Sequence, residues 1–168
     1  MNLKYLIPPL FILIASFYIG YIVITRSRVV PEIRYGVDRC DNCGMVISEK
    51  RFSALAYYKT ENRWVKFDDL GGLFLYIVKH GGLENFQDIY VFDYNTGERI
   101  NGESAYYVKA DPERVWTPMS SGIVAFKDET AAKKFAEKID GTLYDFHELY
   151  IWVYNNPDKV FQMSNMNM

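Results

Sequence analysis

Two thiols and a thioether lie within six consecutive residues of this chain. Cys40 and Cys43 are its only cysteines, and Met45 follows the second of them by two positions. Thiolate and thioether sulfur bind soft ions such as Cu(I), and thiolates also suit zinc. Because Cu(I) needs no shell of anionic oxygen ligands, this segment is the first candidate for a metal site.

Further thioethers occur in two other places. Met119 lies in the turn-like segment TPMSSG at residues 117–122, between two predicted strands. Because loops of this kind often carry function, Met119 is either a further metal ligand or a residue that fills a gap between two parts of the core. The chain ends in Met163, Met166 and Met168, which are separated by polar residues. These form either a frayed terminus or a mobile thioether cluster that picks up or hands over Cu(I).

The Cys40-x-x-Cys43 pair admits three other interpretations. A redox pair would use a cysteine of low pKa, but such motifs lie between a strand and a helix, whereas here a predicted linker precedes the pair and a strand follows it. A structural zinc site needs two more ligands, and only His80 and His147 could complete it. A disulfide between the two cysteines would close too short a loop to stabilise the chain much.

Length and composition predict one globular domain of ordinary size. The chain has 168 residues, of which 49% are hydrophobic and 17% aromatic, so a full core can form. The formal charge of −2, with no long run of one sign, argues against a nucleic-acid partner. No catalytic triad and no glycine-rich phosphate loop is apparent, so the sequence does not predict an enzyme.

The N-terminus has the pattern of a membrane segment. Residues 5–24 are uncharged and almost all apolar, and at about 1.5 Å per residue they would cover the roughly 30 Å hydrocarbon core. No convincing small-x-small cleavage site follows, which predicts an uncleaved anchor over residues 1–25 and a linker over 26–38. The arginines after the span, Arg26, Arg28, Arg34 and Arg39, would place the rest of the chain in the cytoplasm.

The remaining chain predicts an α+β fold of two similar strand-strand-helix halves packed into one domain. The first half has strands over 52–59 and 63–67, a helix over 70–79 and a strand over 88–94. The second has strands over 104–109 and 122–126, a helix over 129–139 and a strand over 142–146. Both halves carry Phe-x-Asp before the helix, at 67–69 and 126–128, and both helices end near glycine. The alternative is that aspartate caps and terminal glycines recur by chance.

Several of these motifs together resemble a known family. Cys43-Gly44-Met45, Phe67-x-Asp69 and Thr117-Pro118-Met119 occur in order, together with the segments at 105–108, 122–126 and 131–141. Over residues 38–147 the chain resembles the nitrous oxide reductase accessory proteins of the NosL type. The resemblance implies a domain over 39–155 with two similar halves, comparable to part of the organomercurial lyase fold.

The resemblance also implies a function and a set of ligands. It implies an extracytoplasmic, membrane-attached Cu(I) protein that delivers copper to nitrous oxide reductase and is not itself an enzyme. It implies that Cys43 and Met119 are Cu(I) ligands and that Met45 belongs to the same Cys-Gly-Met motif as Cys43. We expect Cys40 or Met45 to complete a trigonal sulfur site. An extracytoplasmic domain conflicts with the orientation that the arginines predict.

The chain departs from the family pattern in four respects. Members of the family are usually lipoproteins, whereas this chain has an apparent transmembrane anchor. A histidine often stands in the place of Cys40, and many relatives have a cysteine at the position of Asp68. The Met-rich tail over 156–168 is not part of the pattern. The second thiol, Cys40, would therefore either tighten the site or permit a disulfide that blocks it.

Overall fold

The computed structural model describes residues 28–161, and the compact unit begins at Ile33. The predicted anchor over 1–25 lies outside the described residues, as do residues 162–168 of the predicted tail. Among the residues that are described, no helix has both the length and the apolar character that crossing a membrane requires.

The first half of the domain is a four-stranded antiparallel sheet with one helix. Its elements are β1 (Ala54–Tyr58), β2 (Arg63–Phe67), α2 (Leu70–Lys79), β3 (Phe86–Phe92) and β4 (Arg99–Asn101). The strand order is β2-β1-β3-β4, so β1 is central and β2 is an edge strand. Every residue of β1 is buried. In β2 only the alternate residues Val65 and Phe67 are buried, as expected for a strand with one covered face.

The second half repeats this plan with three strands. It contains β5 (Tyr106–Lys109), β6 (Ile123–Phe126), α3 (Glu129–Ile139) and β7 (Thr142–Tyr144). The order β6-β5-β7 again places the first strand of the half between the second and the third, and both pairings are antiparallel. The two halves therefore share the order of elements that the repeated Phe-x-Asp pattern predicts, and the structure shows that they share the strand arrangement as well.

Helix α4 (Phe146–Asn155) was not predicted from the sequence. The predicted strand over 142–146 ends at Tyr144, and Asp145 then caps the new helix. The Asp145 carboxylate accepts the N–H of Glu148, and the Glu148 carboxylate accepts the N–H of Asp145. This reciprocal cap, Asp-x-x-Glu, is a recognised helix start. The strand prediction was too long because it ignored that signal.

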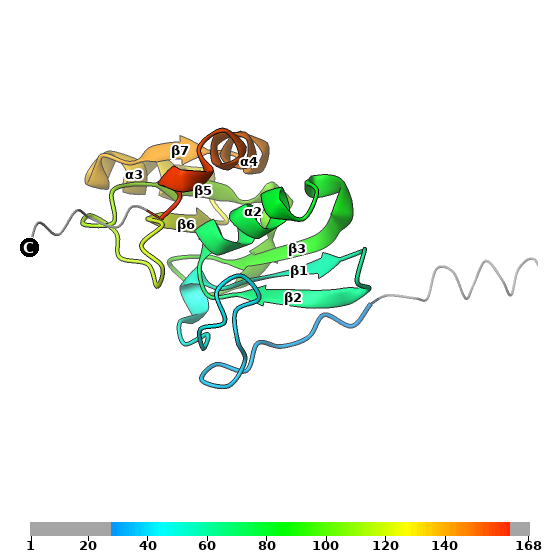
Figure 1. Cartoon of the computed structure of the whole chain (residues 1–168). Coiled ribbons are helices and arrows are strands. Elements are labelled where there is room, and N and C mark those ends of the chain that lie inside the picture. Colours follow the sequence, from blue (N-terminus) through cyan, green and yellow to red (C-terminus); the bar gives the residue numbers. More distant parts are fainter. Residues whose placement is uncertain (1–27, 162–168) are drawn as a thin grey trace, which may run out of the picture. The chain divides into compact units, whose positions relative to one another are not determined.

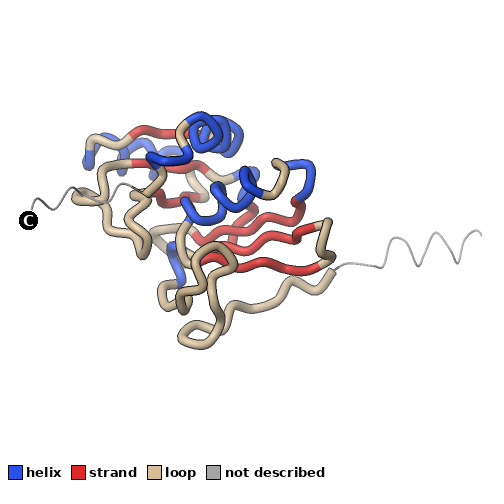
Figure 2. The backbone as a smooth tube through the Cα atoms, viewed as in Figure 1, coloured by secondary structure: helices blue, strands red, loops and turns tan. Residues whose placement is uncertain are grey.

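Short 3-10 turns connect the main elements at Lys50–Phe52, Leu83–Asn85, Gly102–Ser104 and Pro157–Lys159. Figure 1 shows α2 over the sheet of β1 and β3, with α4 on its other side. Figure 2 shows how much of the chain before β1 and between β5 and β6 is loop. These two loop regions carry Cys40, Cys43, Met45 and Met119.

Aromatic rings join the halves through α2. The ring of Phe74 on α2 lies 5.4 Å from that of Tyr107 on β5 and 5.3 Å from that of Phe146 on α4, between ring centroids. All three side chains are almost fully buried. The backbone joins the halves as well, because Asp93, just after β3, forms a parallel bridge with Ala125 on β6. Helix α2 thus packs against elements of both halves.

Candidate metal site at the N-terminus of α2

Helix α2 begins at a buried aspartate that also binds the second half of the chain. Asp69 is the N-cap, and its Oδ1 accepts the N–H of Gly71 at 2.7 Å. Its Oδ2 accepts the backbone N–H of Met119 at 3.0 Å. Burial raises the pKa of Asp69, while the hydroxyls of Ser121 and Thr117 favour its charged form. The Phe-x-Asp motif therefore positions the turn that carries Met119.

That turn is held by its own side chains. Thr117 and Ser121 are buried, and their hydroxyl oxygens accept the backbone N–H groups of Gly122 and Ile123. Gly122 has φ +65°, and a Cβ there would stand 2.1 Å from the carbonyl oxygen of Ala110, so only glycine fits. Met119 is half-buried at the tip. The TPMSSG segment is thus a rigid support for one thioether rather than a loose connection.

The loop with both cysteines folds back on itself. The N–H of Cys40 donates to the carbonyl of Met45, and the N–H of Gly44 donates to the carbonyl of Cys40, each at 2.8 Å. Arg39 and Val46 form an antiparallel bridge at the base of the loop. Cys43 therefore lies at the tip of a tight turn, with its side chain exposed, whereas Cys40 is buried at the base.

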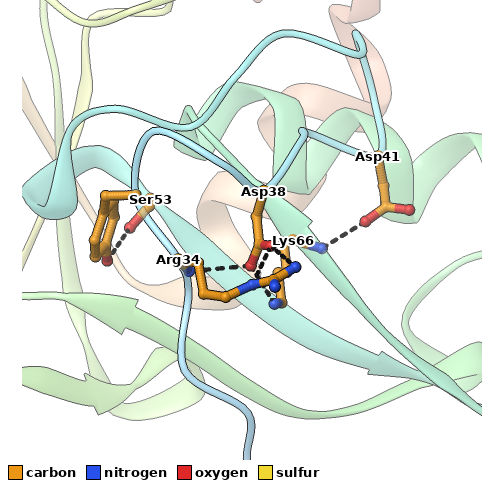
Figure 3. A network of polar contacts seen from close by, with 6 residues as sticks. Arg34, Asp38, Asp41, Ser53 and Lys66 are labelled. Atoms are coloured by element: carbon orange, nitrogen blue, oxygen red, sulfur yellow. Dashed lines mark hydrogen bonds and ion pairs between the residues drawn. The ribbon is translucent and has the colours of Figure 1, made fainter.

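This loop is anchored to the free edge of β2. The N–H of Asp41 donates to the carbonyl of Lys66, and the N–H of Lys66 donates to the Asp41 carboxylate. Figure 3 shows this pair beside Asp38, which accepts the Lys66 ammonium and the Arg34 guanidinium. The Lys66 hydrogen bond above all, with those from Arg34, holds the pKa of Asp38 well below its usual range. At the base of the cysteine loop, the negative charge of Asp38 is therefore balanced by Lys66 and Arg34.

The two thiols and a carboxylate converge where the loop meets α2. The Sγ atoms of Cys40 and Cys43 and an oxygen of Asp68 all lie within 4.8 Å of one another. The Cys43 thiol donates to Asp68 Oδ1 at 3.7 Å. Both thiols are free. Burial, and then the neighbouring Asp68 carboxylate, raise the pKa of the Cys40 thiol. Among the described residues, this group is the one that could hold a metal ion.

The four sulfur residues predicted from the sequence thus lie on two loops that meet the same helix end. Cys43 contacts Asp68, and the backbone of Met119 binds the next residue, Asp69. The Met45 carbonyl helps to close the cysteine loop, and its side chain is 43% exposed. Whether all four bind one ion stays a prediction.

Sequence reasoning did not propose Asp68 as a member of the group. It named the position only as one where many relatives have a cysteine. Asp68 is almost fully buried, next to the cap residue of α2. An aspartate directly before an N-cap, at a position where many relatives have a cysteine, could have signalled a ligand position.

Neither histidine belongs to the cluster. His80 caps the opposite end of α2, where its Nδ1 lies 2.8 Å from the carbonyl oxygen of Tyr76 and its ring stacks on the Tyr76 ring. This is the helix-terminal role that the adjacent glycine indicates. His147 lies on α4 with its ring against Phe146. The zinc interpretation therefore lacks the imidazole ligands that it needs.

Fold and cluster together define a small α+β domain whose loops gather two thiols and a carboxylate in a group able to hold a metal ion. Comparison with known proteins identifies the family within this class of domain. A family model for NosL matches residues 35–151, so the chain belongs to the NosL family. The resemblance seen in the sequence motifs is confirmed.

A solved structure supports the same fold. The chain is similar to the crystal structure of the copper chaperone NosL from Shewanella denitrificans, with a TM-score of 0.62 and 24% identity. The match covers 71% of this chain and 93% of that one. No curated protein matches the chain.

Proposed function

We propose that this NosL-family protein binds Cu(I) as cargo and delivers it to nitrous oxide reductase. The observation that carries the proposal is the convergence of Cys40, Cys43 and Asp68 at the start of α2, with the Met119 turn held on the neighbouring Asp69. The copper chaperone of the same fold lends support. The protein acts as a carrier, not as an enzyme, from a membrane anchor over residues 1–25 and with its domain outside the cytoplasm.

Each sulfur residue has a distinct part in this proposal. Cys43 is exposed, so its thiolate is the first contact for an incoming ion and the main charged ligand. Met119, from the other half of the domain, supplies a neutral thioether as the second ligand. Cys40, which is buried beside Cys43, or Met45, from the same loop, completes a trigonal site. Sulfur donors of this kind select a soft monovalent ion.

Asp68 has a different part because a carboxylate is a hard ligand. Cu(I) binds such oxygen weakly compared with sulfur. Asp68 accepts the thiol of Cys43 and so orients that side chain towards the cluster. A site with neutral thioethers and few ligands leaves the ion exchangeable, which a donor requires.

A thiol-disulfide oxidoreductase is the rival from another class. Such an enzyme needs a reactive cysteine that is exposed and has a lowered pKa. Cys40 has the opposite character, because it is buried and its thiol pKa is raised. The loop after Cys43 leads to an isolated bridge rather than to a helix. The carrier interpretation is therefore the better supported.

The decisive experiment is Cu(I) titration of the full-length protein against a competing chelator. We expect one equivalent to bind, Cys43→Ala to lose most of the affinity, and Met119→Leu to lose less because a thioether is neutral. His80→Gln, at the far end of α2, is the matched control and leaves affinity unchanged. Parent-like affinity in the Cys43→Ala variant would show that the site is wrongly assigned.

Two assays separate the rivals. Metal analysis of protein purified without added metal distinguishes copper from a structural zinc ion. Cys40→Ser would abolish disulfide turnover in an oxidoreductase but leave substantial Cu(I) binding in a carrier. Transfer of bound Cu(I) to copper-free nitrous oxide reductase then tests the recipient.

The side of the membrane on which the domain lies can be tested with the exposed thiol of Cys43. A membrane-impermeant maleimide added to intact cells should label Cys43 if the domain lies outside the cytoplasm. Cys43→Ala is the control, because buried Cys40 reacts slowly. Labelling that occurs only after lysis would instead support the orientation that the arginines predict.

A further inference from the structure

Asp68 belongs to the metal cluster but is not a ligand in the Cu(I) site proposed above. Its side chain is almost fully buried, and both carboxylate oxygens face Cys43, with Oδ1 at 3.7 Å and Oδ2 at 3.9 Å from Sγ. Lys66, the cation two positions before it, binds Asp38 instead. Burying a charge costs free energy unless a partner compensates it. A metal ion bound between Asp68 and the thiols would supply that partner.

The distances within the cluster match those of ligands that share one tetrahedral ion. In a zinc site the metal–sulfur bond is about 2.3 Å and the metal–oxygen bond about 2.0–2.2 Å. Tetrahedral angles then separate a sulfur from an oxygen ligand by about 3.5–3.7 Å and two sulfur ligands by about 3.8 Å. Cys43 Sγ is 3.7 Å from Asp68 Oδ1, and these atoms and Cys40 Sγ all lie within 4.8 Å of one another. Only small shifts of the thiols are needed to place all three around one ion.

The backbone holds Cys40 and Asp68 close together in the absence of an ion. Paired hydrogen bonds join Asp41, which follows Cys40, to Lys66 near the end of β2 (Figure 3). Asp68 comes two positions after Lys66. The backbone N–H groups of Asp68 and Cys43 also donate to the Cys40 sulfur. Hydrogen bonds of this kind orient a metal ligand and stabilise its charged form.

The donors of this group differ from those of the Cu(I) site. Two thiolates and a carboxylate combine soft with hard atoms, whereas Cu(I) prefers sulfur alone. Zn²⁺ binds both cysteine sulfur and aspartate oxygen, and a zinc ion with three protein ligands takes water as its fourth. Cys43 is exposed, so water can reach that position. A divalent ion also neutralises more of the buried negative charge than Cu(I) does.

We propose that Cys40, Cys43 and Asp68 form an exchangeable site for a divalent ion of the zinc class, with a water molecule as fourth ligand. On binding, both thiols lose their protons to the buffer, each sulfur and one carboxylate oxygen bond to the metal, and no electron moves. This site differs from a structural zinc site, which has four protein ligands. Because both ions need Cys43, Zn²⁺ and Cu(I) exclude each other, and Asp68 favours the divalent ion.

The first test uses Co²⁺ as a coloured substitute for Zn²⁺ on the reduced full-length protein. We expect one equivalent to bind with the intense visible bands of tetrahedral cobalt and with thiolate-to-cobalt charge transfer. Zn²⁺ should displace it, and Cu(I) should abolish the same bands because it takes Cys43. Weak octahedral bands without charge transfer would overturn the site, and Cu(I) binding that leaves the cobalt spectrum unchanged would overturn the mutual exclusion.

The second test changes Asp68 alone. Asp68→Asn keeps the shape of the side chain but removes its charge, so Zn²⁺ affinity should fall at least about tenfold. Cu(I) affinity should stay within about threefold of the parent, since the oxygen is not a Cu(I) ligand. Competition with a chromophoric chelator measures both affinities. Asp140→Asn makes the same change at an exposed carboxylate after α3 and should leave both unchanged. Parent-like Zn²⁺ affinity in Asp68→Asn would refute the proposal.

Two sulfur variants should give opposite results for the two ions. Cys40→Ser removes a thiolate from the divalent site and should lose most of the Zn²⁺ affinity while substantial Cu(I) binding remains. Met119→Leu should weaken Cu(I) binding and leave Zn²⁺ affinity unchanged. Such a crossed pattern does not arise from misfolding, which would weaken both ions together. Loss of Zn²⁺ binding in a folded Met119→Leu variant would place the divalent ion at the Met119 turn and overturn the assignment.

The failure of this inference is distinguishable from that of the proposed function. If the parent binds Cu(I) through Cys43 and Co²⁺ gives no tetrahedral thiolate spectrum, the divalent site is wrong and the carrier stands. If Co²⁺ binds with that spectrum and the parent binds no Cu(I) in competition with a chelator, the carrier function fails and the divalent site stands.

Discussion

Both halves of this domain start a helix with the same aspartate cap, but the cap has a different role in each half. Asp69 and Asp128 follow the same Phe-x motif, and each caps the helix after the second strand of its half. Asp128 is exposed, and the N–H that it accepts is that of Ala131, on its own helix. Asp69 is buried, and its second oxygen binds Met119 of the other half. The same local motif therefore only caps a helix in the second half, whereas in the first half it also holds the turn that carries Met119 beside the candidate metal site.

The first turns of the two helices explain the difference. In α2 the cap is followed by Leu70, Gly71 and Gly72, whereas α3 begins with bulkier and charged residues. Because Gly71 and Gly72 carry no side chains, neighbouring loops can approach the helix end closely. Asn42 lies beside Gly72, and Ser121 with Val160 lies beside Gly71. Loops converge on α2 because its first turn has room for them.

The largest effect should come from removing the two caps in turn. Asp69→Ala leaves the N–H groups of Gly71 and Met119 without their buried acceptor, which should cost about 2–4 kcal/mol of unfolding free energy. Asp128→Ala should cost only about 1 kcal/mol, as an exposed cap does. Chemical denaturation of both variants measures the difference.

Cu(I) binding should also distinguish the Asp69 cap from the Asp128 cap. Asp69→Ala should also weaken Cu(I) binding, because the Met119 turn loses its anchor, whereas Asp128→Ala should not. Equal losses of stability in the two variants would contradict the distinct role assigned to Asp69.

A smaller effect should separate the two neighbouring glycines. A Cβ at position 71 would stand 2.5 Å from Ser121 Cβ and 2.8 Å from Val160 Cγ1, so Gly71→Ala should destabilise the domain by about 1–3 kcal/mol through overpacking. At position 72 the nearest atom, Asn42 Nδ2, would be 3.6 Å away.

Gly72→Ala is therefore the matched control. It should be neutral or stabilising by up to about 1 kcal/mol, because alanine favours a helix over glycine. Thermal unfolding of the pair gives the readout. A Gly71→Ala variant as stable as Gly72→Ala would refute the close packing of Val160 and Ser121.

The smallest effect concerns Asp93, which joins the halves. Its carboxylate accepts the N–H groups of Lys127 and Thr96. Burial alone would raise the pKa of Asp93, but these hydrogen bonds outweigh it and lower the pKa. The stabilisation is thus present above the unfolded-state pKa near 4 and is lost as the pH falls through the lower folded value.

Asp93→Asn should therefore cost about 1–2 kcal/mol near neutral pH and progressively less in acid. Unfolding free energies of parent and variant at pH 7 and pH 3 test this. A difference that grows in acid would contradict the sign.

Much of the fold follows from local signals. The strands around residues 54–58 and 63–67 and the helices after Asp69 and Asp128 occur where alternation and capping predict them. Helix α4 was missed although its Asp145 cap is equally local. The site is different. Cys43 and Met119 could be named from their types and motifs, but nothing local indicated that Asp68 would lie against both thiols.

The sequence by itself determined where α2 and α3 begin, which residues carry soft donor atoms, and that two halves share a plan, because caps, side-chain chemistry and periodicity act over a few residues. Only the tertiary structure decided that the cysteine loop, the Met119 turn and Val160 meet at one helix end. Those contacts join residues far apart in the chain. They form because burial of the aromatic core packs α2 against elements of both halves, leaving a glycine-lined terminus for the loops to cover.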